Sequence, residues 1–323
     1  MVCEPMVISV ILCTWNNCQR LRITLDAISR FAIPNVLGWE VVLVNNNCTD
    51  DTDVVAQEFA ARLPLVYVHE PKQGLSRARN AGLAVAAGQL IIFTDDDVKP
   101  YPQWIAAYWD AWRARPNGFY FGGPIESEFE SCSPDPALLP FAPYSVSGLD
   151  WGDEARELTA QECFVSANWA CPAEALRAAG GFDERLGLDP SSGRVKVGEE
   201  YDLMQRLQLA GLRPWYLPQA RIRHFVPAQK CRLRHIAARR EAHGYMWARY
   251  QSDHEMGQVP DWMYKVAVKL WLQWLKERLR GRKAYEECMK VRTMVGRIKG
   301  LRDRIRAQEV GGLAMQGERV RHA

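Results

Sequence analysis

Three consecutive aspartates, Asp95, Asp96 and Asp97, directly follow the apolar run Leu90–Phe93. Adjacent carboxylates repel each other, and folding alone does not require them at the end of a buried strand. Mg²⁺ and similar divalent cations prefer oxygen ligands and can bridge a carboxylate to a diphosphate. The spacing of Asp95 and Asp97 therefore favours a metal site, and the alternative is a solvated acidic turn.

A second acidic group, Glu199 and Glu200, stands near the start of a helix predicted over 200–210. Acids at this position can simply stabilise the positive end of a helix. A carboxylate that is removed from water can also act as a general base. His224 lies farther along the chain, and a lone histidine is usually a packed or surface residue. It becomes a candidate metal ligand only if a metal lies nearby.

Alternating strands and helices position these residues. Four short apolar runs are typical of strands buried on both faces: Val7–Cys13, Val41–Val44, Leu65–Val68 and Leu90–Phe93. Helices are predicted between them over 17–31, from about Thr49, and over 75–87 with Gly88 as the stop. This order predicts an α/β fold with a parallel sheet and helices on both faces. Ligands of such sheets bind at the carboxyl ends of strands, where Asn45 and Asp95 stand.

The middle of the chain has a weaker pattern. Trp104, Tyr108 and Trp112 recur at helical spacing, and Phe119–Phe121 resembles a strand. Residues 126–160 are rich in Pro, Ser and acids, and we expect a long surface excursion there. A helix is predicted over 172–179, ending at Gly180.

The C-terminal part, residues 226–323, carries 22 Lys and Arg against 10 Asp and Glu, a net charge of +12. It is expected to be all-helical. Within Trp262–Leu275, apolar residues fall on one side and lysines flank it. The apolar side consists of Met263, Val266, Ala267, Leu270, Trp271, Trp274 and Leu275, and the lysines are Lys265, Lys269 and Lys276. This helix either lies in a membrane interface or docks on the protein's own core.

Composition limits the class of protein. The 323 residues are 48% hydrophobic and 24% charged, as in a folded globular protein. The nine cysteines form no CxxC pair, so we expect free thiols and no zinc site. There is no basic signal-peptide start and no apolar run of about 18 residues. We therefore expect a cytoplasmic location, with a peripheral position on the inner face of the membrane as an option.

Motif absences narrow the chemistry. The P-loop, the GxGxxG dinucleotide fingerprint and the GxSxG elbow are all missing. Five segments in order resemble the family 2 glycosyltransferases, which are inverting enzymes with the GT-A fold, over about residues 7–245. They are ISVILCTWNN, VVLVNNNCTDDT, GLSRARNAGLAVAAGQLIIFTDDD, ANWACPAEALRAAGGFDERLG and GEEYDLMQRLQLAG.

The resemblance implies a fold and its division. It implies a GT-A, Rossmann-like, doubly wound sheet with a basic helical C-terminal extension. Residues 1–225 would form the nucleotide-sugar and catalytic domain, with a nucleotide half over 1–100 and an acceptor half over 101–225. Residues 226–323 would form the helical region that can associate with a membrane.

The resemblance also implies residue roles. The donor-binding residues would be Thr14, Asn16, Asn45, Arg79, Asp95 and Asp96. Asp95, Asp97 and His224 would hold Mg²⁺ or Mn²⁺. Glu200 matches the position of the family's usual aspartate base, and Glu199 beside it is the other candidate. UDP is the expected nucleotide. Because Asn45 replaces the family's usual base-contacting aspartate, GDP and dTDP stay open.

The reaction implied is inverting transfer of a sugar from a nucleotide-diphosphate sugar to a glycan or lipid-linked acceptor. The basic C-terminal part suggests an anionic membrane surface as a further partner, and no nucleic-acid motif indicates a nucleic-acid partner. Two alternatives stay open. One is a catalytically inactive sugar-nucleotide scaffold. The other is a sugar-1-phosphate nucleotidyltransferase, although Cys13–Asn17 lacks the Gly-rich basic loop of that class.

Overall fold

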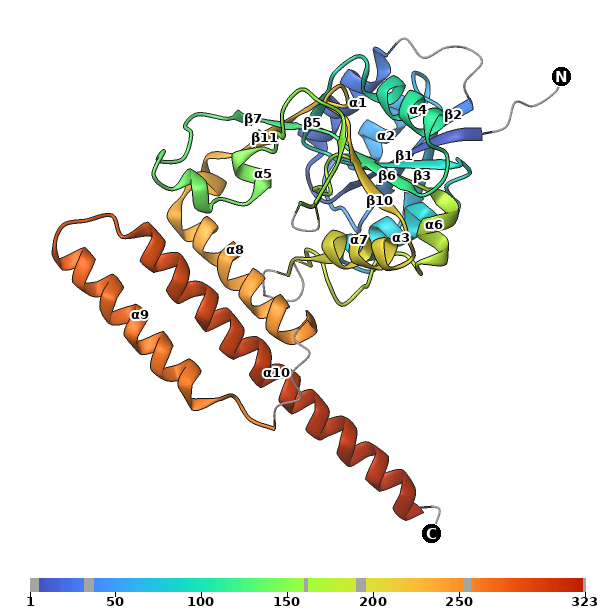
Figure 1. Cartoon of the computed structure of the whole chain (residues 1–323). Helices are drawn as coiled ribbons and strands as arrows, with labels where there is room; N and C mark the ends of the chain where they lie inside the picture. The colour runs from blue at the N-terminus through green and yellow to red at the C-terminus, as the bar shows by residue number, and fades with distance from the viewer. Residues whose placement is uncertain (1–5, 32–37, 160–161, 190–195, 252–256, 322–323) are drawn as a thin grey trace. The chain divides into compact units, whose positions relative to one another are not determined.

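The computed structural model describes residues 6–31, 38–159, 162–189, 196–251 and 257–321. The chain divides into two compact units. An α/β unit consists of residues 1–132, 144–194 and 198–227, and a helical unit consists of residues 133–143, 195–197 and 228–323. Figure 1 shows the elements of each unit.

The four N-terminal strands of the α/β unit are parallel, as predicted. They are β1 (Met6–Thr14), β2 (Gly38–Asn45), β3 (Leu65–His69) and β4 (Leu90–Asp95), in the spatial order β3-β2-β1-β4. The apolar centres of β1, β2 and β4 are buried on both faces, whereas β3 at the edge of the sheet is only partly buried. Each of β1, β2 and β4 runs past its apolar residues into a polar one, and these polar residues begin the site.

Three helices connect these strands: α1 (Cys18–Ser29), α2 (Thr52–Ala60) and α3 (Leu75–Val85). Helix α3 packs on β1 and β2, and Gly82 permits the close approach to Ile11. The prediction that α3 runs to Ala87 with Gly88 as its stop was wrong, since the helix ends at Val85. Gly88 is needed for space, because a Cβ there would lie 2.4 Å from the backbone nitrogen of Ser9.

The main sheet continues beyond β4 in the order β4-β9-β6-β10-β8. These added strands are β6 (Phe119–Gly122), β8 (Arg156–Glu157), β9 (Trp169–Pro172) and β10 (Arg213–Tyr216). β9 is antiparallel to both of its neighbours, and β10 is parallel to β6. The helices of this part are α4 (Trp104–Ala114), α6 (Ala173–Ala178) and α7 (Glu199–Leu209). Figure 1 shows α3, α6 and α7 close together.

A second, three-stranded sheet has the order β5-β11-β7. Its strands are β5 (Val98–Pro100), β7 (Ile125–Phe129) and β11 (Ile222–Val226). The prediction of a surface excursion over 126–160 was therefore wrong in part. The segment contains most of β7 and the short helix α5 (Tyr144–Ser147), and Val146 and Leu149 are buried.

The helical unit is built around α10 (Tyr285–Arg321), which lies between α8 (Leu233–Met246) and α9 (Asp261–Leu279) (Figure 1). Its shorter elements are 3-10 turns at Leu139–Phe141 and Ala228–Cys231 and a π-helical turn at Trp247–Gln251. Helices α8 and α10 come into backbone contact at Gly244, since a Cβ there would lie 2.3 Å from a carbonyl of α10. Within the described residues, no helix is both long and apolar enough to cross a membrane.

One side of α9 packs against the other helices of its unit. This agrees with the alternative that the helix docks on the protein's own core. Met263 is buried, and Val266, Ala267 and Leu270 pack against the same apolar cluster. Trp271, which was expected on this side, is exposed.

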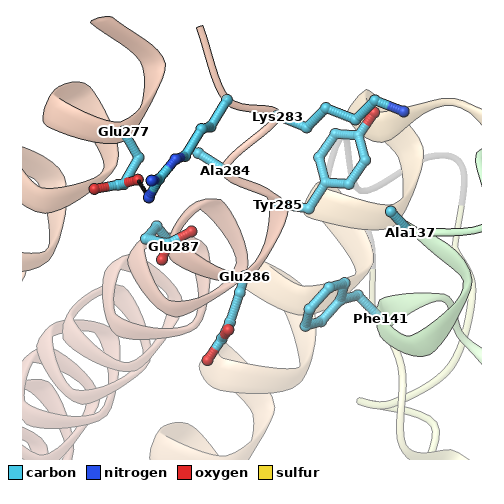
Figure 2. Close-up of a pocket in the computed structure, with 9 residues that line it drawn as sticks. Ala137, Phe141, Glu277, Lys283, Ala284, Tyr285, Glu286 and Glu287 are labelled. Atoms are coloured by element: carbon cyan, nitrogen blue, oxygen red, sulfur yellow. Dashed lines mark hydrogen bonds and ion pairs between the residues drawn. The ribbon is translucent and has the colours of Figure 1, made fainter. Parts of the chain in front are cut away.

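A shallow pocket of the helical unit lies where α9, α10 and residues 137–141 meet (Figure 2). Arg282 bonds Glu277 at 2.6 Å, while Lys283 and Tyr285 both bond Asp135. Arg282 and Lys283 are thus each paired with a carboxylate of the same region. These bonds attach the 133–143 segment to the start of α10.

Candidate functional site

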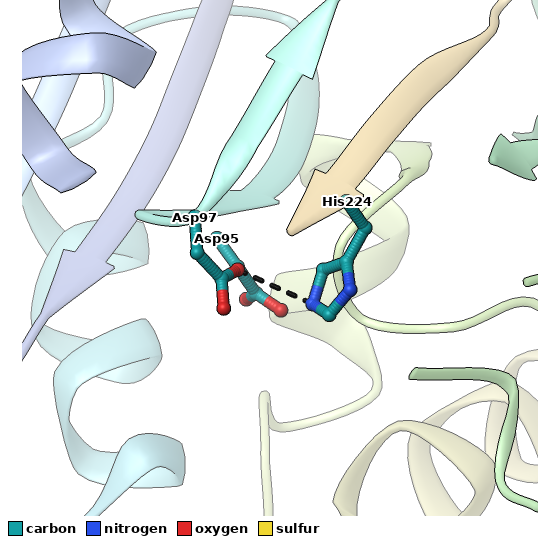
Figure 3. Close-up of side chains that lie close together, drawn as sticks. All are labelled: Asp95, Asp97 and His224. Carbon is teal, nitrogen blue, oxygen red and sulfur yellow. Dashed lines mark ion pairs between the residues drawn. The ribbon is translucent and has the colours of Figure 1, made fainter. Parts of the chain in front are cut away.

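Asp95, Asp97 and His224 come together at the carboxyl end of β4. One ligand atom of each residue lies within 4.8 Å of the others, and the Asp97 Oδ1 to His224 Nε2 distance is 3.2 Å. Figure 3 shows the two carboxylates directed toward the imidazole. Two carboxylate oxygens and one imidazole nitrogen are a donor set that divalent cations such as Mn²⁺ accept. These side chains therefore fit a divalent metal.

Backbone pairing in the second sheet explains why His224 reaches the aspartates. β5 begins one residue after Asp97, and β11 pairs with it so that His224 lies opposite Val98. The Phe225 backbone N–H also donates to the Asp97 carbonyl at 2.8 Å. The histidine is thus placed by strand register, and its side chain is almost fully buried.

Asp96 faces a different set of partners from its neighbours. Its carboxylate accepts hydrogen bonds from the Thr14 hydroxyl at 2.6 Å and the Asn17 amide at 2.8 Å. Burial, and then the negative charge of Asp97, raise the pKa of Asp96 to about 7. Asp96 therefore links the end of β4 to the end of β1. The side chains of Asp96 and Thr14 are hydrogen-bonded to each other.

Arg79 on α3 connects the two acidic groups. Its guanidinium lies 3.4 Å from Asp95 Oδ1 and 3.1 Å from Glu199 Oε1, and the side chain is 2% exposed. It also lies over the Phe182 ring. A buried charge is costly unless it is paired, so the two carboxylates hold Arg79 in place and Arg79 holds them. Arg79 was expected near the nucleotide, but its bridge between Asp95 and Glu199 was not predicted.

Glu199 and Glu200 have different surroundings although they are adjacent. Glu199 is buried and its carboxylate is ion-paired with Arg79. Glu200 is half-buried, and its Oε2 is buried without a hydrogen-bond partner among the described residues. Burial, and then the charge of Glu199, raise the pKa of Glu200 to about 8. Glu200 thus has an oxygen available for a proton, whereas Glu199 has a structural charge partner.

The end of β2 carries Asn45, which is buried. Its amide nitrogen donates to Asp53 at 3.0 Å and to the Tyr67 hydroxyl at 2.7 Å, and its carbonyl accepts from the Cys48 N–H at 2.7 Å. The other asparagine of the donor-binding set, Asn16, accepts from the Thr49 N–H at 2.7 Å and has a positive φ of 48°. These bonds fix the turns that follow β1 and β2.

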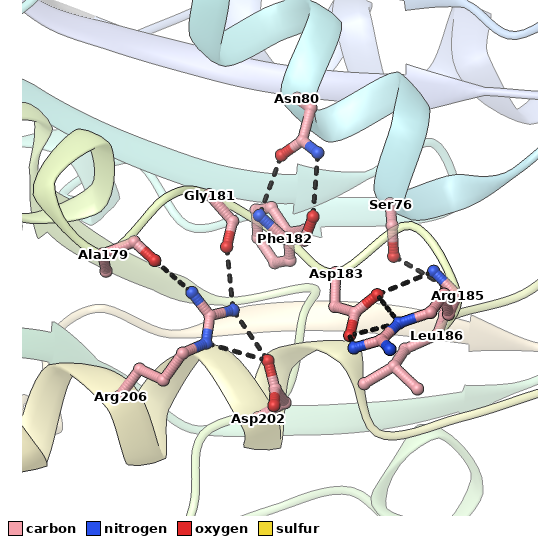
Figure 4. Close-up of polar contacts among 10 residues, drawn as sticks. All are labelled: Ser76, Asn80, Ala179, Gly181, Phe182, Asp183, Arg185, Leu186, Asp202 and Arg206. Carbon is pink, nitrogen blue, oxygen red and sulfur yellow. Dashed lines mark hydrogen bonds and ion pairs between the residues drawn. The ribbon is translucent and has the colours of Figure 1, made fainter. Parts of the chain in front are cut away.

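A second polar network, shown in Figure 4, holds the loop between α6 and α7. Asn80 exchanges hydrogen bonds with the Phe182 backbone, at 2.9 and 2.8 Å. Arg206 donates to the Gly181 carbonyl at 2.8 Å, and Ser76 donates to the Leu186 carbonyl at 2.8 Å. Helix α3 thus binds this loop with Ser76 and Asn80 and binds the acids with Arg79.

The sequence carries a signal for the pairing of Arg79 and for the role of Asn17. Arg79 stands four residues before the buried Leu83, so its side chain faces the core side of α3 and must be paired. Asn17 directly precedes α1 and is a typical N-cap residue, yet it makes no side-chain cap bond. Its side chain is therefore free to bind Asp96.

The fold and the site together define a class. The protein is an open α/β protein whose carboxylates and histidine gather at the carboxyl ends of parallel strands, where such sheets bind their ligands. The family model described as glycosyl transferase family 2 matches residues 9–134 of this chain. This segment of the chain is therefore similar to glycosyl transferase family 2, and the fold of the chain is the GT-A fold.

Several proteins are similar to the chain. Glycosyltransferase AglE of Haloferax volcanii is 28% identical over 100 residues, which cover 30% of this chain and 33% of AglE. The glucosyl-dolichyl phosphate glucuronosyltransferase of the same organism is 21% identical over 68% of this chain and 69% of its own length. The solved structure of the mannosyltransferase PcManGT from Pyrobaculum calidifontis, in complex with GDP-Man and Mn²⁺, superposes with a TM-score of 0.59. It is 20% identical, covers 92% of this chain and 87% of its own, and establishes the fold alone.

Proposed function

We propose that the protein is an inverting glycosyltransferase that moves a sugar from a nucleotide-diphosphate sugar to a hydroxyl of its acceptor. The observation that carries this proposal is the pairing of two sites through Arg79. A carboxylate–histidine group lies on one side of Arg79 and an acid pair lies on the other. With a divalent cation bound, the carboxylate–histidine group would suit a charged diphosphate. The acid pair would suit a hydroxyl that must lose a proton.

Asp95, Asp97 and His224 would hold Mg²⁺ or Mn²⁺. When bound there, the cation supplies Lewis-acid stabilisation of the diphosphate leaving group. Arg79 fixes the position of Asp95 through its 3.4 Å contact, so the carboxylate has little freedom to turn away.

Glu200 is our choice for the general base. Its Oε2 has no hydrogen-bond partner within the described part of the chain and would accept the proton of the acceptor hydroxyl, while Glu199 stays paired with Arg79. The raised pKa makes Glu200 a stronger base than an ordinary carboxylate once it is ionised. A single displacement with one base inverts the anomeric centre. An α-linked donor would therefore give a β-linked product.

Asn45 and its neighbours would border the nucleobase. The Asn45 carbonyl accepts one hydrogen bond, from Cys48, and so retains one lone pair. One acceptor matches the single N3–H of uracil, whereas the guanine edge presents three donor hydrogens. We therefore favour UDP over GDP.

The acceptor we propose is a glycan or lipid-linked sugar. The similarity over two thirds of both chains to an enzyme named for a dolichyl-phosphate-linked sugar supports a lipid-linked one.

The test is thermal-shift binding of UDP, GDP, dTDP and CMP, each with and without Mn²⁺. A ligand that binds only the native state raises the melting temperature by mass action. We expect a Mn²⁺-dependent shift with UDP. Asp97→Asn should remove the Mn²⁺-dependent part and serves as the matched control. No shift with any of the four nucleotides in a folded sample would refute the proposal, and NMR of a transfer product then tests inversion.

A further inference from the structure

Helix α9 has a second apolar side that the described residues of the helical unit leave exposed. Tyr264, Val268, Trp271, Leu272 and Leu279 are all exposed, with 57% exposure for Val268, 47% for Trp271 and 53% for Leu272. Val268 follows Tyr264 by four residues, Trp271 and Leu272 follow Val268 by three and four, and Leu279 follows Leu272 by seven. These spacings keep the side chains on one side of a helix. They form what we call the outer stripe, which runs from the second turn of α9 to its end.

The outer stripe differs from the side that packs on α10. That inner side consists of Met263, Val266, Ala267 and Leu270. Because the inner residues already provide the contact with the helical core, the outer stripe is not needed to hold α9 in place. Large aromatic and aliphatic side chains gathered on one exposed face mark an interaction surface.

Basic residues border the outer stripe. Lys265, Lys269 and Lys276 are exposed and follow one another at helical spacing along a single edge of it. Residues 226–323 carry a net charge of +12, so a second copy of this chain would bring the same positive charge to the contact. An anionic surface complements this charge and another copy does not.

We infer that the outer stripe of α9 binds the interface of an anionic lipid bilayer. The helix lies parallel to the membrane plane, its apolar stripe enters the boundary between headgroups and acyl chains, and the three lysines contact lipid phosphates. Trp271 and Tyr264 suit this depth because each combines an apolar ring with a polar group. The inference concerns the helical unit and does not depend on the transferase activity.

The test is flotation of the full chain with lipid vesicles. We compare pure phosphatidylcholine vesicles with vesicles that contain about 30 mol% phosphatidylglycerol, at low salt and at about 0.5 M salt. We expect flotation with the anionic vesicles at low salt and much less with neutral vesicles. Replacing each of the three lysines with Gln should weaken binding by about fivefold per lysine.

The decisive variant is Trp271→Ser with Leu272→Ser, because the change falls on exposed side chains and leaves the inner side intact. Vesicle binding should fall by at least about tenfold. The matched control is Val85→Ser with Leu209→Ser, which removes two exposed apolar residues from the α/β unit. Its flotation should equal that of the parent, and melting curves check that both variants fold.

Three outcomes would overturn the inference. The first is failure of the parent to float with anionic vesicles. The second is equal flotation of the stripe variant and the parent, which would mean that charge alone binds lipid. The third is a parent dimer that the stripe variant dissociates, without vesicle binding, which would identify a second copy as the occupant.

Discussion

The proposed roles of the two adjacent glutamates make opposite predictions for two isosteric changes, Glu199→Gln and Glu200→Gln. Each replaces one carboxylate oxygen with an amide and leaves side-chain volume unchanged. If Glu200 is the base and Glu199 the partner of Arg79, the first change should mainly lower stability. The second should mainly lower turnover.

The size of each effect follows from the contacts. Glu199→Gln removes one of two carboxylates from a guanidinium that is 2% exposed. Breaking a buried ion pair costs about 3–5 kcal/mol. Because Asp95 stays beside Arg79, we expect the lower end, about 3 kcal/mol. This corresponds to a fall in Tm of about 6–12 °C for a chain of this size.

Glu200→Gln should raise stability at pH 8, whereas Glu199→Gln lowers it. The pKa of Glu200 rises from 4.5 to about 8 on folding, so the native state loses stability as pH increases through this interval. The full shift corresponds to about 5 kcal/mol, and solvent at the half-buried side chain reduces it to about 2 kcal/mol. The neutral glutamine avoids this loss. The variant should therefore melt higher than the parent at pH 8 and equally at pH 4.5.

The assay combines melting curves over pH with release of nucleoside diphosphate from the donor. Glu200→Gln should lower kcat by about 10²–10⁴-fold and leave nucleotide binding unchanged. For the parent, kcat/KM should rise with pH, reach half of its maximum near pH 8 and level off above it, because the base acts only when it is ionised. Parental turnover in Glu200→Gln, together with loss of turnover in a stably folded Glu199→Gln, would refute the assignment.

Three further predictions follow from the site and the sheet. Arg79→Lys keeps the charge but cannot reach both carboxylates, so the Tm should fall and the Mn²⁺-dependent nucleotide shift should shrink, as measured by thermal shift. Asp97→Asn should abolish that Mn²⁺-dependent shift and change the metal-free Tm by only a few degrees. Gly88→Ala should lower the free energy of unfolding by about 1–3 kcal/mol in urea titrations, because its Cβ would collide with the β1 backbone. Gly257→Ala, which meets nothing within 4 Å, is its control.

The N-terminal half of the fold could be predicted because three of its four strands, β1, β2 and β4, have apolar centres that are buried on both faces. A residue such as Val42 is apolar whichever side of the strand it occupies, so the run is continuous and readily recognised. The polar residue at the end of each run then locates the site. Asn45 and Asp95 were predicted at strand ends in this way, and both are the last residues of their strands.

The second sheet could not be predicted because β5 and β11 lack a long continuous apolar run. β5 is three residues long and contains Pro100, while β11 alternates buried and exposed residues. Such segments become strands only because their partners lie far away in the sequence, as when His224 pairs with Val98. The different surroundings of Glu199 and Glu200 could not be predicted either, because they arise from packing against α3 and the loop after α6.

The three adjacent aspartates are compatible because each one faces a different partner. Asp95 is the last residue of β4, whereas Asp96 and Asp97 form the turn before β5, so the three side chains meet different neighbours. Asp95 contacts Arg79 and Asp97 contacts His224, whereas Asp96 is held by two hydrogen-bond donors from β1 and the turn after it. The middle carboxylate therefore joins the two strands that border the site. Asp95 and Asp97, which we propose as metal ligands, contact Arg79 and His224, so one short acidic segment joins β4 to β1 and supplies the carboxylates of the candidate metal site.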